Sequence, residues 1–121
     1  MKDTMRNYDN IKIAVVGMGY VGLSLAIMLA QHHEVLAVDI DSEKVELINK
    51  KCSPLKDEYV EKYLKETELH ILATTDSKNA YNEADYVVIA VPTNFNVEIN
   101  AFDTSILETV VEDVHTTNPK A

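Results

Sequence analysis

The stretch IKIAVVGMGYVG, residues 11–22, decides the fold that this sequence predicts. Its first half is apolar and rich in β-branched residues, which is typical of a buried strand, and it stops at Gly17. Glycines return as Gly19 and Gly22, and an apolar helical pattern follows them. A strand, a glycine-rich turn and a helix in this order give the G-x-G-x-x-G match the context that predicts a dinucleotide-binding site.

Each glycine of this motif has its own physical role. Gly17 permits the tight turn off the strand, Gly19 lets a pyrophosphate approach the backbone, and Gly22 lets the helix lie close to the strand. The first N–H groups of the helix then face the phosphates, and the helix dipole favours their negative charge. The cofactor-binding residues expected in this loop are Gly17, Met18, Gly19, Tyr20 and Gly22.

A second signal is the acid that ends the next predicted strand. That strand covers residues 34–39, and Asp39 lies 20 residues after Gly19. A carboxylate at this place accepts hydrogen bonds from the adenosine ribose hydroxyls and repels the 2′-phosphate of NADP. Ile40 and Asp41 follow it instead of an arginine, so the predicted cofactor is NAD.

Composition narrows the other possibilities. The 121 residues suffice for one domain with a sizeable core, and the formal net charge of −9 makes nucleic acid and anionic membranes poor partners. The lone Cys52 excludes an internal disulfide and fits a reducing cytoplasm, while the four histidines show no metal-ligand spacing. Acids in residues 1–10 and glycines within residues 11–30 argue against a signal peptide or membrane span. We therefore expect a cytoplasmic protein without a metal.

Hydrophobic periodicity divides the chain into alternating elements. Residues 1–10 are expected to be a flexible leader, and residues 11–121 an incomplete nucleotide-binding domain. The helix at 20–31 is apolar nearly all round, which predicts burial on most faces. Tyr59 and Tyr63 are expected to pack rather than to catalyse. The predicted strands are 11–17, 34–39, 69–74 and 85–91; the predicted helices are 20–31, one beginning near 41 or 42, 57–66, 76–82 and 103–117, with a loop from 92 to about 100.

This order of elements predicts an α/β fold, a Rossmann-like doubly wound parallel sheet with strand order 3-2-1-4. Ligands bind beyond the carboxyl ends of such strands, where the order reverses. Thr93 lies there, either as a ligand contact or as a turn residue after Pro92. Lys44 is either a solvated lysine or a contact to the adenosine ribose. The apolar strand 85–91 would be an open edge, which favours a truncated chain over pairing with a second copy.

Several segments resemble one enzyme family. The strings KIAVVGMGYVGLSLA, AVDIDSEKVELIN, SPLKDEYVEKYL, TTDSKNAY and AVPTNFNVEINAFDT are similar to the N-terminal domain of bacterial UDP-glucose 6-dehydrogenases, from Ile11 to about Val114. The resemblance implies NAD contacts at Val21, Asp39, Lys44 and Thr93. It also implies a parent enzyme, a homodimer through regions mostly outside this chain, that oxidises UDP-glucose twice with two NAD to UDP-glucuronate through a cysteine thioester.

The same resemblance places every catalytic residue beyond the end of this chain. Cys52 does not match the family nucleophile, so no catalytic residue is assigned and the chain alone is expected to be inactive. One alternative is a related dehydrogenase that acts on UDP-N-acetylmannosamine or GDP-mannose. Another is a free-standing NAD-sensing module. A structural domain that has lost nucleotide binding is disfavoured by the intact glycine loop and Asp39.

Overall fold

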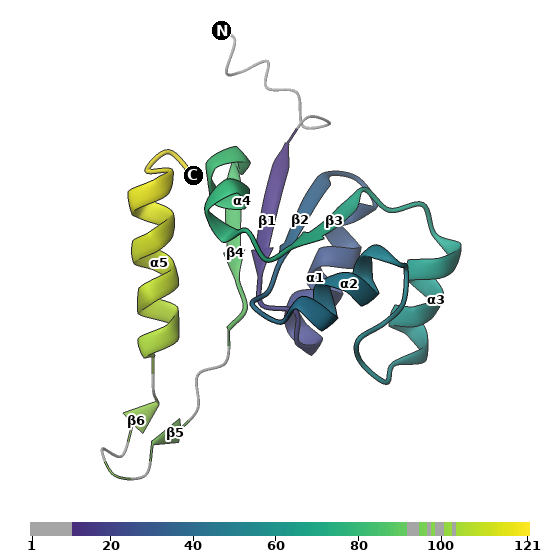
Figure 1. Cartoon of the computed structure of the whole chain (residues 1–121), viewed down its shortest axis with the longest axis horizontal. Helices are drawn as coiled ribbons and strands as arrows, with labels where there is room; N and C mark the ends of the chain where they lie inside the picture. The colour runs from purple at the N-terminus through teal and green to yellow at the C-terminus, as the bar shows by residue number, and fades with distance from the viewer. Residues whose placement is uncertain (1–10, 92–94, 97, 99–100, 103) are drawn as a thin grey trace, which may run out of the picture.

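The computed structural model of the chain describes residues 11–91, 95–96, 98, 101–102 and 104–121. Four parallel strands form one sheet in the order β3-β2-β1-β4, which confirms the predicted Rossmann-like topology (Figure 1). The strands are β1 (Lys12–Val16), β2 (Glu34–Val38), β3 (Ile71–Thr74) and β4 (Tyr86–Ile89). The helices are α1 (Tyr20–Ala30), α2 (Ser42–Asn49), α3 (Glu58–Glu66), α4 (Ser77–Glu83) and α5 (Ser105–Thr117).

Helices cover both faces of this sheet. Helices α1, α2 and α3 lie on one face, and α4 and α5 lie on the other (Figure 1). Side chains alternate between the two cores along β1, since Ile13 and Val15 belong to the first and Ala14 and Val16 to the second. All four are buried. A strand buried on both sides needs a continuous apolar run, which is why residues 11–16 show almost no polar alternation.

The parallel register brings three loops to one rim. Val16 pairs with Val38 and with Ile89, and Val38 pairs with Thr74, so the strands end level with one another. The backbone continues this pattern for one residue, because the N–H of Gly17 donates to the carbonyl of Val38 at 2.8 Å. The glycine loop, the β2–α2 loop and the β3–α4 loop therefore meet beyond the carboxyl ends of the strands.

Polar side chains hold the outer elements in place. Asn49 of α2 acts as a partner for the edge strand β3: its Nδ2 donates to the carbonyl of Ala73 at 2.9 Å, and the N–H of Ala73 donates to Asn49 Oδ1 at 2.8 Å. Asn118, just after α5, donates to the carbonyls of Tyr81 and Ala84 at 2.9 and 3.0 Å. This amide satisfies the last carbonyls of α4 and fixes α5 against it.

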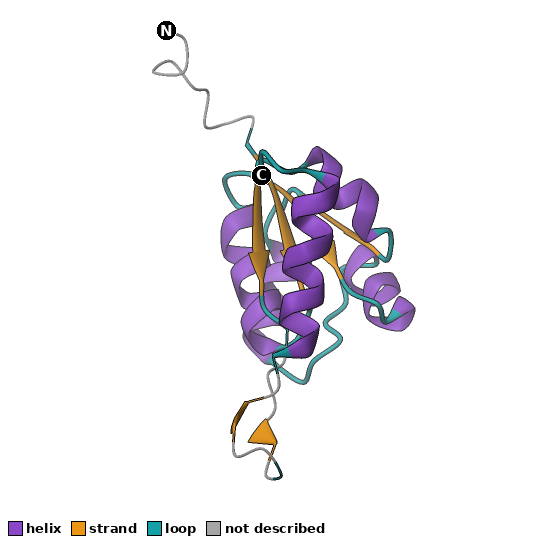
Figure 2. Cartoon of the chain, turned by 90° about the vertical axis from the view of Figure 1, so that its left-hand side faces the viewer, coloured by secondary structure: helices purple, strands orange, loops and turns teal. Residues whose placement is uncertain are grey.

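Three sequence-based expectations are wrong in detail. Helix α1 is not buried on most faces, because Val21 and Met28 are 67% and 60% exposed. Tyr59 is 78% exposed and does not pack in the core, where Val60 and Leu64 take its place. The expected loop after residue 92 contains an antiparallel pair, β5 (Phe95–Asn96) and β6 (Ala101–Phe102), which projects beyond the carboxyl ends of the parallel strands (Figure 2).

Candidate functional site

A cleft of about 670 Å³ lies at the rim where the strands end. It brings together three of the residues predicted to bind a cofactor: Gly17, Asp39 and Lys44. One wall comes from the β2–α2 loop, and the opposite wall comes from α4 and α5. The remaining residues that line the cleft are Val16, Val38, Ile40, Asp41, Thr75, Ser77, Tyr81, Val91, Ser105, Ile106, Thr109, Val110 and Asp113.

The glycine loop is shaped by close backbone packing. Gly17 has a φ of +97°, and a Cβ there would lie 2.5 Å from the carbonyl oxygen of Ala90 at the end of β4. A Cβ on Gly22 would overlap the carbonyl oxygen of Gly17. A Cβ on Gly19, in contrast, would meet nothing within 4 Å. Gly17 and Gly22 are therefore required by the fold, whereas Gly19 faces open space.

The carboxylate of Asp39 connects the glycine loop to the β2–α2 loop. Its Oδ2 accepts from the N–H of Met18 at 2.8 Å, and its Oδ1 accepts from the N–H of Asp41 at 2.8 Å. Each oxygen thus has a different backbone donor, and the two donors lie on either side of the carboxylate. Because a carboxylate offers about four acceptor positions, the two bonds fix its orientation and leave acceptor capacity facing the cleft.

The N-terminus of α1 differs from those of the three helices that follow it. The side chains of Asp41, Asp57 and Asp76 accept hydrogen bonds from the first backbone amides of α2, α3 and α4. Gly19 is the N-cap of α1, with no side-chain hydrogen bond and no acid in the first turn. The first amides of α1 are therefore available to an anion, which the helix dipole also attracts.

The other predicted contacts are spread around the loop. The side chain of Met18 is fully buried in the core, so only its backbone can face a ligand. Tyr20 and Val21, in the first turn of α1, are 58% and 67% exposed and do not line the cleft. Thr93 lies outside the described residues.

Sequence reasoning missed the wall formed by α4 and α5. Tyr81 is 3% exposed, and with Asp113 and Thr109 it lines the side of the cleft opposite the β2–α2 loop. Periodicity places Asp113 on the polar face of its helix, and only the docking of α5 on α4 brings it to the cleft. Sequence reasoning also missed Ile40, next to Asp39: it lines the cleft, and an apolar side chain that is 98% exposed there suits a flat apolar ligand.

Tyr81, in this wall, makes the stability of the fold depend on pH. Burial raises the pKa of Tyr81, the negative charge of Asp113 raises it further, and a hydrogen bond with Ser77 opposes both effects. Since the folded-state pKa lies above that of the unfolded chain, stability is fully present below about pH 10 and falls as pH rises through the folded-state value.

We expect Tyr81→Phe to flatten this alkaline loss of stability, because phenylalanine has no proton to release. Urea unfolding between about pH 9 and pH 11 measures it. Tyr59→Phe, at a side chain that is 78% exposed, is the matched control and should keep the wild-type slope. If the stability of Tyr81→Phe falls with pH as steeply as that of wild type, Tyr81 is not the group that causes the alkaline loss of stability.

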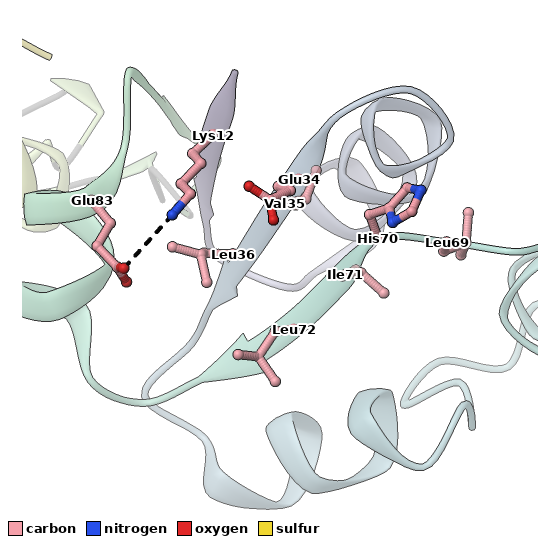
Figure 3. Close-up of a pocket in the computed structure, with 9 residues that line it drawn as sticks. All are labelled: Lys12, Glu34, Val35, Leu36, Leu69, His70, Ile71, Leu72 and Glu83. Carbon is pink, nitrogen blue, oxygen red and sulfur yellow. Dashed lines mark ion pairs between the residues drawn. The ribbon is translucent and has the colours of Figure 1, made fainter. Parts of the chain in front are cut away.

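A second hollow, of about 390 Å³, lies beside α4 over β2 and β3, from their amino ends to Leu36 and Leu72 (Figure 3). Lys12, Glu34 and His70 stand at the amino ends of β1, β2 and β3, and Lys12 Nζ lies 3.8 Å from a carboxylate oxygen of Glu83. Ligands of doubly wound sheets bind at the carboxyl ends, so this hollow is the weaker candidate.

Within the described residues, no group of three or more His, Cys, Asp and Glu side chains is arranged to hold a metal ion. None of the helices in the same part of the chain is long and apolar enough to cross a membrane.

Comparison with known proteins agrees with this geometry. Residues 11–120 match the model of the UDP-glucose/GDP-mannose dehydrogenase family, NAD binding domain. UDP-glucose 6-dehydrogenase of Streptococcus pneumoniae is 52% identical over 102 residues, which are 84% of this chain and 26% of that enzyme. GDP-mannose 6-dehydrogenase of Pseudomonas aeruginosa is 32% identical over 86% of this chain and 24% of that enzyme.

Solved structures show the same likeness. A ternary complex of GDP-mannose dehydrogenase from Pseudomonas aeruginosa superposes with a TM-score of 0.78 at 32% identity, covering 87% of this chain and 24% of that one. UDP-glucose dehydrogenase from Pyrobaculum islandicum superposes with a TM-score of 0.82 at 22% identity, covering 93% of this chain and 26% of that one. This likeness supports the fold alone. The chain spans about a quarter of the length of these UDP-glucose and GDP-mannose dehydrogenases. It belongs to the UDP-glucose/GDP-mannose dehydrogenase family, as the NAD-binding domain.

Proposed function

We propose that this chain binds NAD in the rim cleft and serves as the cofactor domain of a UDP-glucose 6-dehydrogenase. The observation that carries the NAD site is the carboxylate of Asp39, held by two backbone amides beside an uncapped helix N-terminus. The 52% identity to a UDP-glucose 6-dehydrogenase supports the substrate of the whole protein. The 32% identity to GDP-mannose 6-dehydrogenase makes GDP-mannose the alternative substrate.

The glycine loop fits the pyrophosphate of such a cofactor. A Cβ at Gly19 would enter open space, so the position in front of this residue is free for a phosphate to approach the backbone. The first turn of α1 brings its amides to the same place, and no acid stands in that turn to compete with a phosphate. Gly17, Gly19 and Gly22 with the backbone of Met18, Tyr20 and Val21 form the proposed cradle.

The β2–α2 loop fits the adenosine part. Asp39 keeps acceptor capacity for ribose hydroxyls after binding its two amides. Lys44, in the first turn of α2, lines the same cleft, and Ile40 offers an exposed apolar surface to the adenine. Thr93 stays a proposed contact from the resemblance of the PTN turn. NAD bound here would supply the hydride acceptor for alcohol oxidation.

The chemistry on the sugar belongs to other parts of the parent enzyme. Cys52 does not line the cleft, and its Sγ donates to the carbonyl of Lys50 at 3.7 Å. We therefore assign no catalytic residue to this chain and expect no NADH from it with UDP-glucose. We also propose residues 1–10 as a leader, residues 11–121 as part of the cofactor domain, a homodimeric parent and a cytoplasmic location. The single cysteine supports the cytoplasm, because it excludes an internal disulfide.

Calorimetric titration of the folded chain with NAD tests the site. Wild type is expected to bind, and Gly19→Ala is expected to weaken NAD at least about tenfold, because the new Cβ stands where the pyrophosphate approaches. The same variant should stay folded, with a free energy of unfolding within about 1 kcal/mol of wild type, since that Cβ meets no protein atom within 4 Å and only the N-cap preference of α1 is lost.

The substitution thus separates binding from folding. A folded wild-type chain that binds no NAD would contradict the proposal. So would a Gly19→Ala chain that binds NAD as tightly as wild type.

A further inference from the structure

Asp41 has two contacts that matter for the choice of cofactor. Its backbone N–H donates to Asp39 Oδ1 at 2.8 Å, which places it directly beside the proposed ribose acceptor. Its own Oδ1 accepts from the N–H groups of Glu43 and Lys44 at 2.9 and 3.4 Å. The carboxylate therefore occupies the first amides of α2, a helix that begins at the edge of the cleft.

Helix N-terminal amides are a common binding site for phosphate. Asp41 and Lys44, at the start of α2, line the same cleft as Asp39. A 2′-phosphate on a ribose that is bound by Asp39 would therefore enter the part of the cleft beside the first turn of α2. In this chain those amides already bind a carboxylate of the same protein. The cleft adds Asp39 and Asp113 as further carboxylates, against Lys44 as the one cation among the described residues that line it.

We propose that Asp41 is a second specificity-determining residue that excludes the 2′-phosphate of NADP. It acts by its negative charge and by filling the amides of α2 that would otherwise bind that phosphate. Asp39, the acid that follows β2, is then insufficient to explain the preference for NAD, because removal of Asp39 alone leaves the α2 amides blocked. This inference rests on the proposed NAD site and names a determinant within it.

The test is a double-mutant cycle read by calorimetry with NAD and with NADP. The four chains are wild type, Asp39→Ser, Asp41→Ser and the double variant. Serine at 41 keeps a side-chain cap on α2 but carries no charge, and a phosphate can displace it. Asp39→Ser is expected to weaken NAD and to leave NADP weak. The double variant is expected to bind NADP about tenfold more tightly than Asp39→Ser does, with NAD changed less than about threefold.

Asp57 provides the matched control. It caps α3 in the same way, its Oδ1 accepting from the amides of Tyr59 and Val60 at 2.9 and 3.2 Å, but it does not line the cleft. Asp57→Ser in the Asp39→Ser background removes the same charge and should leave NADP affinity unchanged. An equal gain from Asp57→Ser and Asp41→Ser would overturn the inference, since the effect would then come from net charge.

Ionic strength gives an independent reading that needs no change at Asp41. In Asp39→Ser, the ratio of the Kd for NADP to the Kd for NAD should fall as salt is raised, because salt screens the repulsion between Asp41 and the 2′-phosphate. A ratio that does not change with salt would overturn the proposed role of Asp41 and leave the proposed NAD site standing. Equal NADP affinity of Asp39→Ser and the double variant would do the same. Absence of NAD binding by the folded wild-type chain overturns the proposed function, and this inference with it.

Discussion

Gly22→Ala is expected to lower the free energy of unfolding by about 3 kcal/mol or more. The added Cβ would overlap the carbonyl oxygen of Gly17, which is a backbone atom and cannot rotate away as a side chain could. Gly17 is itself held in place, because its N–H donates to the carbonyl of Val38 and a Cβ on it would already lie 2.5 Å from the carbonyl oxygen of Ala90. The clash therefore has to separate α1 from β1 and β4, which disturbs the centre of the fold.

Urea unfolding followed by circular dichroism measures this loss. A variant without a cooperative transition has lost the whole free energy of unfolding, which is the largest effect expected. Gly19→Ala is the matched control, since it adds the same methyl group three residues earlier in the same motif, where it enters open space. Its free energy of unfolding should stay within about 1 kcal/mol of wild type. If both alanine variants lose the same stability, close packing of Gly22 on Gly17 is not what the motif requires.

The sheet could be predicted because its information is local. Short apolar runs, turn glycines and the order of elements suffice for the topology β3-β2-β1-β4 once crossovers are right-handed. The exposure of α1 could not be predicted in the same way. The apolar sequence of residues 20–30 shows which side chains of the helix are able to be buried, but not which of them another element covers. Val21 and Met28 are exposed because no described element lies over them.

The candidate site was predictable to a similar degree. Gly17, Asp39 and Lys44 could be placed at one rim because each follows a strand or opens a helix there. The wall of α5 depends on the contact of Asn118 with α4, which joins residues more than 30 positions apart. Likewise, the hydrogen bond from the N–H of Met18 to Asp39 joins residues 21 positions apart, and no periodicity in the sequence predicts it. Contacts of this kind set the details of the site.

That bond makes Asp39→Asn the second large effect. Asp39 uses both oxygens, one for Met18 and the other for Asp41, whereas asparagine has a single acceptor oxygen. Its NH₂ group would face one of the two backbone donors, which then loses its acceptor. We expect a loss of about 1–3 kcal/mol in the free energy of unfolding and a 10- to 100-fold loss of NAD affinity, at about 1.5–3 kcal/mol per hydrogen bond to a charged group.

Asp57→Asn isolates the geometric cause. Asp57 accepts both of its backbone amides on the single atom Oδ1, so the asparagine oxygen can replace it completely. We expect this variant to unfold within about 0.5 kcal/mol of wild type, although it removes the same charge from the same kind of loop. Equal destabilisation by Asp39→Asn and Asp57→Asn in urea would contradict the two-sided role of Asp39. A selective loss in Asp39→Asn would show that Asp39, the proposed ribose acceptor, also holds the glycine loop in place.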